Sequence, residues 1–382
     1  MKVLIRWTAL ALLVLTVLVF ARHPFFWQHY FVALTPGEAT PVYQPRELVP
    51  GGNQPPAPRE SPASESLDIN GLEQAADYAG THQSRALIVS RHGYIVFERY
   101  WQGTRYDTVS DSKGLARILT ALATGAAISA RKIGWPDEPI GYFISAWRDD
   151  PRGRITIRNL LQLSSGLAGS TAPPLRTDII ADYLQRAAVA QPGTRWVDQS
   201  SDPELLAHVI ELATRQRYAQ FISQSVWRRI GAGDAWVWLD HPGGAAHVDE
   251  GFLAQQGDWI RVGELLLTGG KYQGAEVIVP RWMPEIMQPA AANGNYGAYV
   301  HLGAHPTPGV TPYVTGEVFA VEGGGNRLWL IPSLEIAILR MGARTQNWDE
   351  ASIPNLIIRA ARDFVPPAAR PGADLRQLVP NH

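Results

Sequence analysis

Short apolar runs near residue 90 and near the C-terminal end predict a β-sheet assembled from distant parts of the chain. The runs 86–90 and 94–100 are rich in β-branched and aromatic residues, and Arg91-His92-Gly93 separates them, which is typical of a β-hairpin. Three further runs are divided by glycines or by a proline and lie at 318–321, 328–331 and 336–339. Because both groups read as adjacent antiparallel strands, we expect one antiparallel sheet built from both regions.

Between these runs the apolar spacing is helical. Leu115, Ile118, Leu119, Leu122 and Ala126 recur at three- and four-residue intervals, which predicts a buried helix that ends near residue 130. Ser201-Asp202-Pro203-Glu204 has the pattern of a capping box before a helix over 205–213. A helix ending at Gly269-Gly270 and a terminal helix over 353–363 follow. We therefore expect an α+β fold in which helices flank the sheet and a large, mostly helical insertion lies between its two parts.

The N-terminus has the pattern of a membrane-inserted segment. Lys2 and Arg6 precede an uninterrupted apolar run over 7–21. We expect an uncleaved anchor that contacts the lipid bilayer, with the body on the periplasmic side of the inner (cytoplasmic) membrane. Val19-Phe20-Ala21 also fits a cleavage site, so secretion to the periplasm after signal cleavage is the alternative.

Changes in composition divide the chain into four parts. Residues 1–34 form the anchor or signal segment, and residues 35–66 are rich in proline and glycine, which is typical of an extended linker. The globular domain is expected over 67–365, and residues 366–382 are expected to form a flexible tail. The domain composition, with 46% apolar and 18% charged residues over the whole chain, supports a large buried core.

Composition also excludes several kinds of partner. The net charge is -1 and lysine occurs only at positions 2, 113, 132 and 271, so no basic surface is expected to bind nucleic acid. The chain has no cysteine and lacks phosphate-loop, dinucleotide and His-Glu-x-x-His motifs, so we expect no cofactor. His241, His247, His301 and His305 lie in Pro/Gly-rich stretches without paired carboxylates, so we interpret them as surface histidines and expect no metal site.

Residues 155–167, Ile-Thr-Ile-Arg-Asn-Leu-Leu-Gln-Leu-Ser-Ser-Gly-Leu, resemble the segment that follows the nucleophile helix in serine β-lactamases and penicillin-binding proteins. Class C β-lactamases, D-Ala-D-Ala peptidases and 6-aminohexanoate-dimer hydrolases belong to the same group of serine hydrolases. The hairpin and several short segments support the resemblance in the right order, namely 137–140, 192–196 and 266–270. The resemblance covers about 67–365 and implies the β-lactamase/transpeptidase-like fold.

The first family motif looks degenerate. Relatives carry a nucleophilic Ser and a Lys three residues later on one helix face. Alignment from both flanks places these positions at Gly114 and Arg117, which supply neither a hydroxyl nor a general base. Ser110 and Lys113 have the same spacing one helical turn earlier and could form a shifted catalytic pair. Alternatively, residues 110–112 cap the central helix.

The second and third motifs depart from the family pattern as well. Where relatives have Tyr-x-Asn, this chain has Asp198-Gln199-Ser200, so Asp198 is either a base or part of a polar loop. Where relatives have a cation before a small residue and Gly, it has Glu322-Gly323-Gly324, followed by Gly325. The backbone N–H groups of the glycines at 323–325 could still donate hydrogen bonds to an oxyanion, but Glu322 would repel a substrate carboxylate. A glycine-rich bulge between two strands is the structural alternative.

Two functions follow from these motifs, and a purely structural scaffold with a filled cleft is a third possibility. The first is a membrane-tethered pseudoenzyme that binds a ligand or partner, such as a small amide or ester or a cell-wall peptide, near Gly114 and Glu322. The second is an active amide or ester hydrolase with Ser110 as nucleophile and Lys113 as base. A Ser110 Oγ within about 3.2 Å of Lys113 Nζ would favour the enzyme. Arg117 paired with Asp198 or Glu322 would favour the impaired site.

Overall fold

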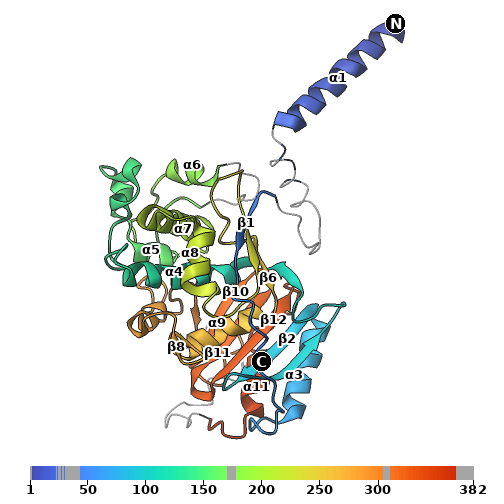
Figure 1. The fold of residues 1–382 in the computed structure, drawn as a ribbon, viewed down its shortest axis with the longest axis vertical. Helices are drawn as coiled ribbons and strands as arrows, with labels where there is room; N and C mark the ends of the chain where they lie inside the picture. The colour runs from blue at the N-terminus through green and yellow to red at the C-terminus, as the bar shows by residue number, and fades with distance from the viewer. Residues whose placement is uncertain are drawn as a thin grey trace, which may run out of the picture.

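The computed structural model describes residues 2–22, 24, 27, 30, 44–169, 178–303 and 310–366. The tail expected over 366–382 therefore lies outside the described residues, apart from Pro366. In Figure 1 the folded body contains a sheet that is built from the early (blue) and late (orange) parts of the chain, with helices on either side.

The main sheet has six strands in the order β3-β2-β12-β11-β10-β9, and all neighbouring strands are antiparallel. The predicted hairpin is confirmed as β2 and β3, and the three predicted late strands are confirmed as β10, β11 and β12. The strands are β2 (Ser84–Arg91), β3 (Tyr94–Tyr100), β9 (His301–Leu302), β10 (Phe319–Gly323), β11 (Asn326–Ile331) and β12 (Ile336–Gly342). The distant segments meet because β12 pairs with β2, with Ile338 opposite Val89.

Helices cover both faces of this sheet. On one face, Ile336 and Ile338 of β12 pack with α3 (Ile69–Thr81) and α11 (Ser352–Ala360). On the other face, Ala337 and Leu339 pack with α4 (Arg117–Ser129) and α9 (Asp258–Leu267). Because side chains alternate along a strand, β12 is buried at every position. The predicted central helix, the helix before Gly269 and the terminal helix are confirmed as α4, α9 and α11.

The insertion between α4 and β5 (Ala235–Trp238) is mostly helical, as predicted. Its helices are α5 (Ile157–Leu161), α6 (Ile179–Leu184), α7 (Ser201–Thr214) and α8 (Tyr218–Ile222), followed by a π-helical turn η6 (Ser223–Trp227). A capping box does form, but at α5, where Thr156 and Asn159 bond reciprocally. A short α10 (Met283–Ile286) follows later, after the two-stranded ribbon β7 (Lys271–Tyr272) and β8 (Ala275–Glu276).

The predicted capping box at α7 is wrong. The helix begins at Ser201, its N-cap Ser200 makes no side-chain cap bond, and Ser201 Oγ donates to Asp202. Glu204 does not reach back to the helix end, because it is buried and bonded to Tyr183 and His247. Tertiary partners thus replace the local capping pattern.

A second sheet has the order β1-β5-β6-β4, formed by β1 (Arg46–Val49), β5 (Ala235–Trp238), β6 (Phe252–Gln255) and β4 (Val109–Asp111). Strand β1 lies inside the stretch predicted as a linker, and its pairing with β5 corrects that prediction for part of 35–66. The segment after β1 is also attached, because Arg261 donates to the carbonyls of Gln54 and Pro55. The folded domain therefore begins near residue 46 rather than 67.

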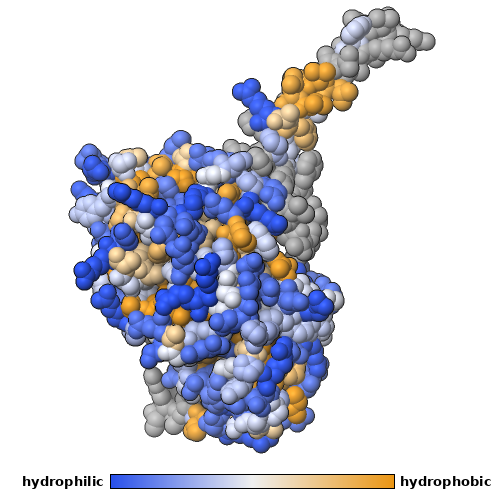
Figure 2. Space-filling model, in the orientation of Figure 1, coloured by the Kyte–Doolittle hydropathy of each residue, from blue (hydrophilic) through white to orange (hydrophobic). Residues whose placement is uncertain are grey.

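The N-terminal segment is helical over α1 (Lys2–Arg22), which extends away from the body (Figure 1). Figure 2 shows apolar side chains gathered on the end of this helix that is nearer the body, and those of Leu13, Leu15 and Leu18 are each about 60% exposed. Within the described residues, no helix combines the length and apolarity of a membrane-spanning segment.

Candidate functional site

Gly114 has no room for a side chain. It lies in the 3-10 turn η1 (Lys113–Ala116) that leads into α4, and strand β10 crosses directly beside it. A Cβ on Gly114 would lie 2.8 Å from the Glu322 carbonyl oxygen and 2.9 Å from Gly323 Cα. A Cβ on Gly323 would lie 2.0 Å from the Gly114 nitrogen. The two backbones fill the space that a serine side chain would need at the family nucleophile position.

Ser110 and Lys113 do not form the predicted shifted pair. Ser110 lies on strand β4, opposite Ala254 of β6, rather than one turn earlier on the central helix. Its side-chain oxygen is buried and has no hydrogen-bond partner among the described residues. Lys113 Nζ instead lies 3.0 Å from Asp111 Oδ2. The required hydroxyl–amine contact is therefore absent, because Ser110 belongs to strand β4 and the helical turn begins only at Lys113.

The alternative role of residues 110–112 as helix caps is met only by Asp111. Its Oδ1 accepts from the backbone nitrogens of Lys113 and Gly251. Ser112 occupies the N-cap position of η1 without a side-chain cap bond, and its Oγ accepts from Trp259 Nε1 at 2.9 Å. Asp111 thus fixes the left-handed turn at Lys113, where φ is 51°.

Arg117 is held by carboxylates from two other segments. Its Nε donates to Asp249, and its Nη1 lies 2.6 Å from Asp198 Oδ1. The side chains of Arg117 and Asp249 are only 14% and 6% exposed. Burial alone would lower the pKa of Arg117, but the neighbouring carboxylates outweigh it and raise the pKa well above its ordinary value. Arg117 is therefore a permanent cation that cannot accept a proton.

Tyr296 completes the surroundings of Arg117. Its ring is buried and contacts the rings of Trp196 and His301 edge-on, at 5.2 and 4.8 Å between centroids. Burial raises the pKa of Tyr296, and the carboxylate of Asp198 adds to the rise, whereas Arg117 opposes it. A phenol thus lies near the family Lys position, although the sequence has no Tyr in the second motif.

Glu322 is neutralised where the sequence predicted an unbalanced anion. His301 Nε2 lies 2.7 Å from its Oε1, and Arg327 Nη2 lies 2.9 Å from its Oε2. Burial would raise the pKa of Glu322, but these partners lower it to about 2. Arg327 also pairs with Glu350. The predicted repulsion of a substrate carboxylate is thus weakened by the Arg327 cation on the adjacent strand β11.

The glycines after Glu322 form a hairpin turn and not the bulge considered from sequence. Gly323 pairs with Asn326, so Gly324 and Gly325 are the two turn residues. Gly324 has φ of +66°, which favours glycine, and a Cβ there would lie 3.1 Å from Lys113 Cγ. The Gly325 carbonyl accepts from buried Arg340. Gly323 faces Gly114, so this backbone packs against the turn rather than lining an open oxyanion hole.

The second motif is part of a buried polar network. Gln199 Nε2 donates to Ser165 Oγ and Asp202 Oδ1, which links this loop to the 155–167 segment. Burial raises the pKa of Asp202 to about 6, although its hydrogen bonds oppose the rise. Asp198 pairs with Arg117, and Ser200 only precedes α7. Of the two interpretations, the structure places Asp198 in a loop ion pair.

Sequence reasoning missed several residues that surround this region. Asp249, Tyr296 and His301 come from segments far from the motifs, whereas Arg327 follows the third motif on β11, and of these four only the histidine had been noted. His247 is buried and stacked on Trp238, so it is not the surface histidine expected, whereas the side chain of His301 is 38% exposed and pairs with Glu322. Across the described ranges, no group of three or more His, Cys, Asp or Glu side chains has a metal-binding arrangement.

Comparison with known proteins identifies the family. A family model described as Beta-lactamase matches residues 69–362. The chain belongs to the beta-lactamase family. This beta-lactamase-family chain is 26% identical over 163 residues to 6-aminohexanoate-dimer hydrolase from Paenarthrobacter ureafaciens. That match covers 39% of the chain and 40% of the relative, so the chain matches about two fifths of this curated relative's length.

Solved structures confirm the β-lactamase/transpeptidase-like fold expected from the resemblance. A structure titled "Putative 6-aminohexanoate-dimer hydrolase from Bacillus anthracis" superposes with a TM-score of 0.69 at 17% identity, covering 83% of this chain and 90% of that one. A penicillin-binding protein from Bacillus halodurans superposes with a TM-score of 0.59 at 14% identity, covering 75% of this chain and 97% of that one. The chain is thus a serine-hydrolase-family domain in which the three motif positions are occupied by other residues.

Proposed function

We propose that this beta-lactamase-family domain has lost acyl-serine hydrolysis at the family position and acts by binding a ligand or partner there. The observation that carries the proposal is the contact between Gly114 and β10. A hydroxyl-bearing side chain is absent at this position, and the 2.8 and 2.9 Å approaches of Glu322 and Gly323 leave no space for one.

The surroundings of Arg117 also support a loss of chemistry. A guanidinium in two ion pairs cannot remove a proton from a nucleophile. The neighbouring phenol of Tyr296 has a raised pKa, so at neutral pH it is also protonated. Of the described residues at the family site, neither Arg117 nor Tyr296 is therefore poised to activate a hydroxyl.

The alternative of an active hydrolase with Ser110 and Lys113 has weaker support. Ser110 is 6% exposed and its Oγ is covered by protein atoms, so a substrate carbonyl would have to displace the surrounding β-sheet to reach it. Lys113 Nζ lies 3.0 Å from Asp111 Oδ2 and so is directed to a carboxylate and not to the Ser110 hydroxyl.

The rim of the site favours a polar ligand. Glu322, His301 and Lys113 each expose about a third of their side chains there, so both signs of charge are accessible. A small amide or ester, or a peptide of cell-wall origin, offers matching donors and acceptors and remains the proposed ligand class. Its carboxylate would have to interact with the cations and not with Glu322.

The test is a comparison of wild type with Ser110→Ala on chromogenic esters, amides and a β-lactam. We expect neither protein to exceed the buffer rate. Turnover by wild type that Ser110→Ala abolishes would establish the alternative enzyme, and turnover that Ser110→Ala leaves unchanged would place a nucleophile elsewhere. Asp107→Asn, which changes an exposed side chain, is the control variant. Asn159→Asp would not serve, because Asn159 caps helix α5.

We also propose that α1 attaches the domain to a lipid bilayer, with the body outside the cytoplasm at the inner membrane. The two cations that precede the apolar run and the exposed apolar side chains of α1 support this. Signal cleavage with release to the periplasm is the competing outcome. Fractionation of full-length protein and of a variant lacking residues 1–43 decides: we expect only the full-length form to sediment with membranes, and a shortened soluble product would indicate cleavage.

A further inference from the structure

A surface hollow of about 340 Å³ lies in the insertion, between the central helix α4 and the helix α5 in the sequence. It is lined by Pro139 and residues of the 3-10 turn η2 (Ile140–Tyr142), by the loop 148–150 that follows the turn η3 (Ser145–Trp147), and by residues of the turn η4 (Pro151–Arg154). Its volume lies within the range of small-molecule sites, which is roughly 300–1,000 Å³. None of the residues that line it belongs to the three family motifs.

The walls of this hollow are rigid. Gly141 and Gly153 let two turns touch, because a Cβ on Gly141 would lie 2.9 Å from Gly153 Cα and one on Gly153 would lie 2.1 Å from the Trp147 carbonyl oxygen. Asp150 accepts from the backbone and the side chain of Arg152. Arg152 in turn donates to the carbonyls of Leu184 and Arg186 and stacks over Trp147. The hollow is therefore held open by backbone contacts and by a fixed ion pair.

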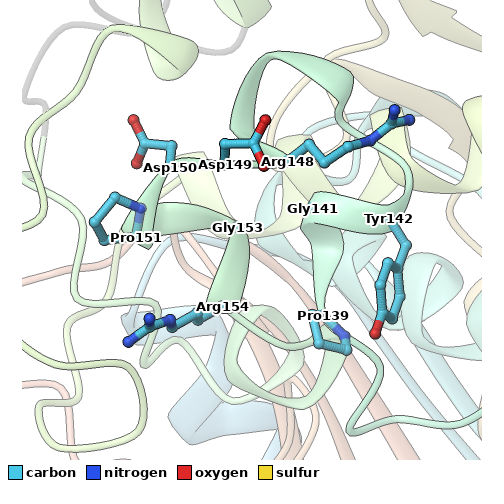
Figure 3. Close-up of a pocket in the computed structure, with 9 residues that line it drawn as sticks. All are labelled: Pro139, Gly141, Tyr142, Arg148, Asp149, Asp150, Pro151, Gly153 and Arg154. Atoms are coloured by element: carbon cyan, nitrogen blue, oxygen red, sulfur yellow. The ribbon is translucent and has the colours of Figure 1, made fainter.

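Unused binding groups surround it. Arg148 and Arg154 are exposed, and the described part of the chain offers neither side chain an ion pair or hydrogen bond. Tyr142 is 70% exposed, which is unusual for an aromatic ring. Figure 3 shows Arg148 and Tyr142 on one side of the hollow and Arg154 on the opposite side.

The charges around the hollow favour an anion. Asp150 is already neutralised by Arg152, at 2.7 Å, so Asp149 is the one remaining free carboxylate in the lining. Arg148 and Arg154 outnumber it. Figure 3 shows Asp149 and Asp150 together at one edge, away from Arg154. Arginine is suited to carboxylate and phosphate groups, since its fork presents several donors at once.

We propose that this hollow is a second ligand site, separate from the family site, for a small anion that carries a ring. Its phosphate or carboxylate group would bind Arg148 or Arg154, and its ring would lie against Tyr142. The glycine contacts keep the site preformed, so binding requires no rearrangement of the fold.

Titration with phenyl phosphate, with inorganic phosphate and with benzoate tests the proposal by calorimetry on the folded domain. We expect phenyl phosphate to bind, and one of the two variants Arg148→Ala and Arg154→Ala to weaken it by about tenfold, since that variant removes the charge-assisted hydrogen bond to the phosphate. Tyr142→Ala should weaken phenyl phosphate but leave inorganic phosphate unchanged. Benzoate in place of phenyl phosphate separates carboxylate from phosphate preference.

The matched control is Arg281→Ala, which removes an exposed arginine outside the hollow. Thermal unfolding of each variant, expected to match wild type, shows that the fold is intact. If wild type binds none of the three probes, or if Arg281→Ala weakens binding as much as the more affected of Arg148→Ala and Arg154→Ala does, the proposal is wrong. Because family-site residues are untouched, this outcome is independent of the function proposed above.

Discussion

Gly323 of strand β10 packs backbone against backbone on Gly114, so closely that a Cβ on Gly323 would come within 2.0 Å of the Gly114 nitrogen. Both positions are motif positions of the beta-lactamase family. The contact places β10, which lies between β11 and β9 in the sheet, at the position that the motif spacing assigned to the family nucleophile. The absence of a side chain at position 114 and the close approach of β10 are therefore compatible with each other.

A side chain at position 114 should destabilise the domain without restoring activity. Gly114→Ser and Gly114→Ala would each force β10 away, and overpacking of this kind typically costs about 1–3 kcal/mol. Chemical denaturation measures the difference in free energy of unfolding. Gly294→Ala is the control, because its Cβ meets nothing within 4 Å. A Gly114→Ser protein that is as stable as wild type would contradict the close contact.

Removal of the Arg117 guanidinium should be costly because it leaves Asp249 buried without its cation. We expect Arg117→Ala to lower the free energy of unfolding by about 3–5 kcal/mol. Arg117→Lys should recover only part of this, since an ammonium cannot reach both carboxylates in the same geometry. The exposed Arg105 pairs with Asp107 at the surface, so Arg105→Ala should cost at most about 1 kcal/mol. Equal decreases in the free energy of unfolding for Arg117→Ala and Arg105→Ala would show that the buried Arg117–Asp249 pair contributes no more than a surface pair.

Glu322 should give the domain stability that is lost in acid. Its pKa falls to about 2 in the folded state, below the ordinary value of 4.5. The ionised carboxylate therefore stabilises the fold fully above about pH 4.5, and this contribution disappears as the pH falls toward 2. Since the side chain is 33% exposed, we expect Glu322→Gln to cost only about 1–2 kcal/mol at pH 7.

The free energy of unfolding of wild type and Glu322→Gln, measured from pH 7 to pH 2.5, tests this directly. The gap between the two proteins should shrink as the pH falls. Glu317→Gln, which removes an exposed carboxylate before β10, should track wild type throughout. If the difference in free energy of unfolding between the two proteins did not depend on pH, the contacts of Glu322 with His301 and Arg327 would not stabilise its ionised form.

Asp202 should have the opposite pH dependence. Burial raises its folded pKa to about 6 from an ordinary 3.8. Its contribution is therefore most favourable below about pH 3.8 and is lost as the pH rises through 6. We expect the free energy of unfolding of Asp202→Asn to fall less than that of wild type between pH 4 and pH 6, as measured by denaturation at several pH values. Asp107→Asn is the surface control, and an unchanged slope in Asp202→Asn would contradict the shift.

The elements that are set by nearby residues were predictable from the sequence. The β2–β3 hairpin and α4 were predictable because the spacing of their apolar residues along the chain matches the positions that are buried in the fold. Strand β1 was missed because only four residues in a Pro/Gly-rich stretch carry it, and its partner β5 lies nearly two hundred residues away. The capping box at Ser201 was wrong because Glu204 has stronger buried partners in Tyr183 and His247.

The site was predictable only in part. Alignment of the motifs by their spacing suggested that Gly114 lies near Glu322 and that Arg117 could pair with Asp198, and both contacts are present. The spacing between motifs was enough to identify these positions. The partners Asp249 and Tyr296 were not predictable, since ion pairs across more than a hundred residues depend on tertiary structure. The spacing of Ser110 and Lys113 fits one face of a helix, but Ser110 lies in strand β4 and pairs with β6. A spacing of three residues does not by itself distinguish a helix from a strand followed by a turn.

The central claim is that the domain cannot be acylated at the family site. Intact-mass spectrometry after exposure to an activated fluorophosphonate and, separately, to a penicillin measures this most directly. We predict no mass increase with either reagent while the protein remains folded. A covalent adduct, above all one that maps to Ser110 and disappears in Ser110→Ala, would contradict the account and establish an acyl-serine hydrolase.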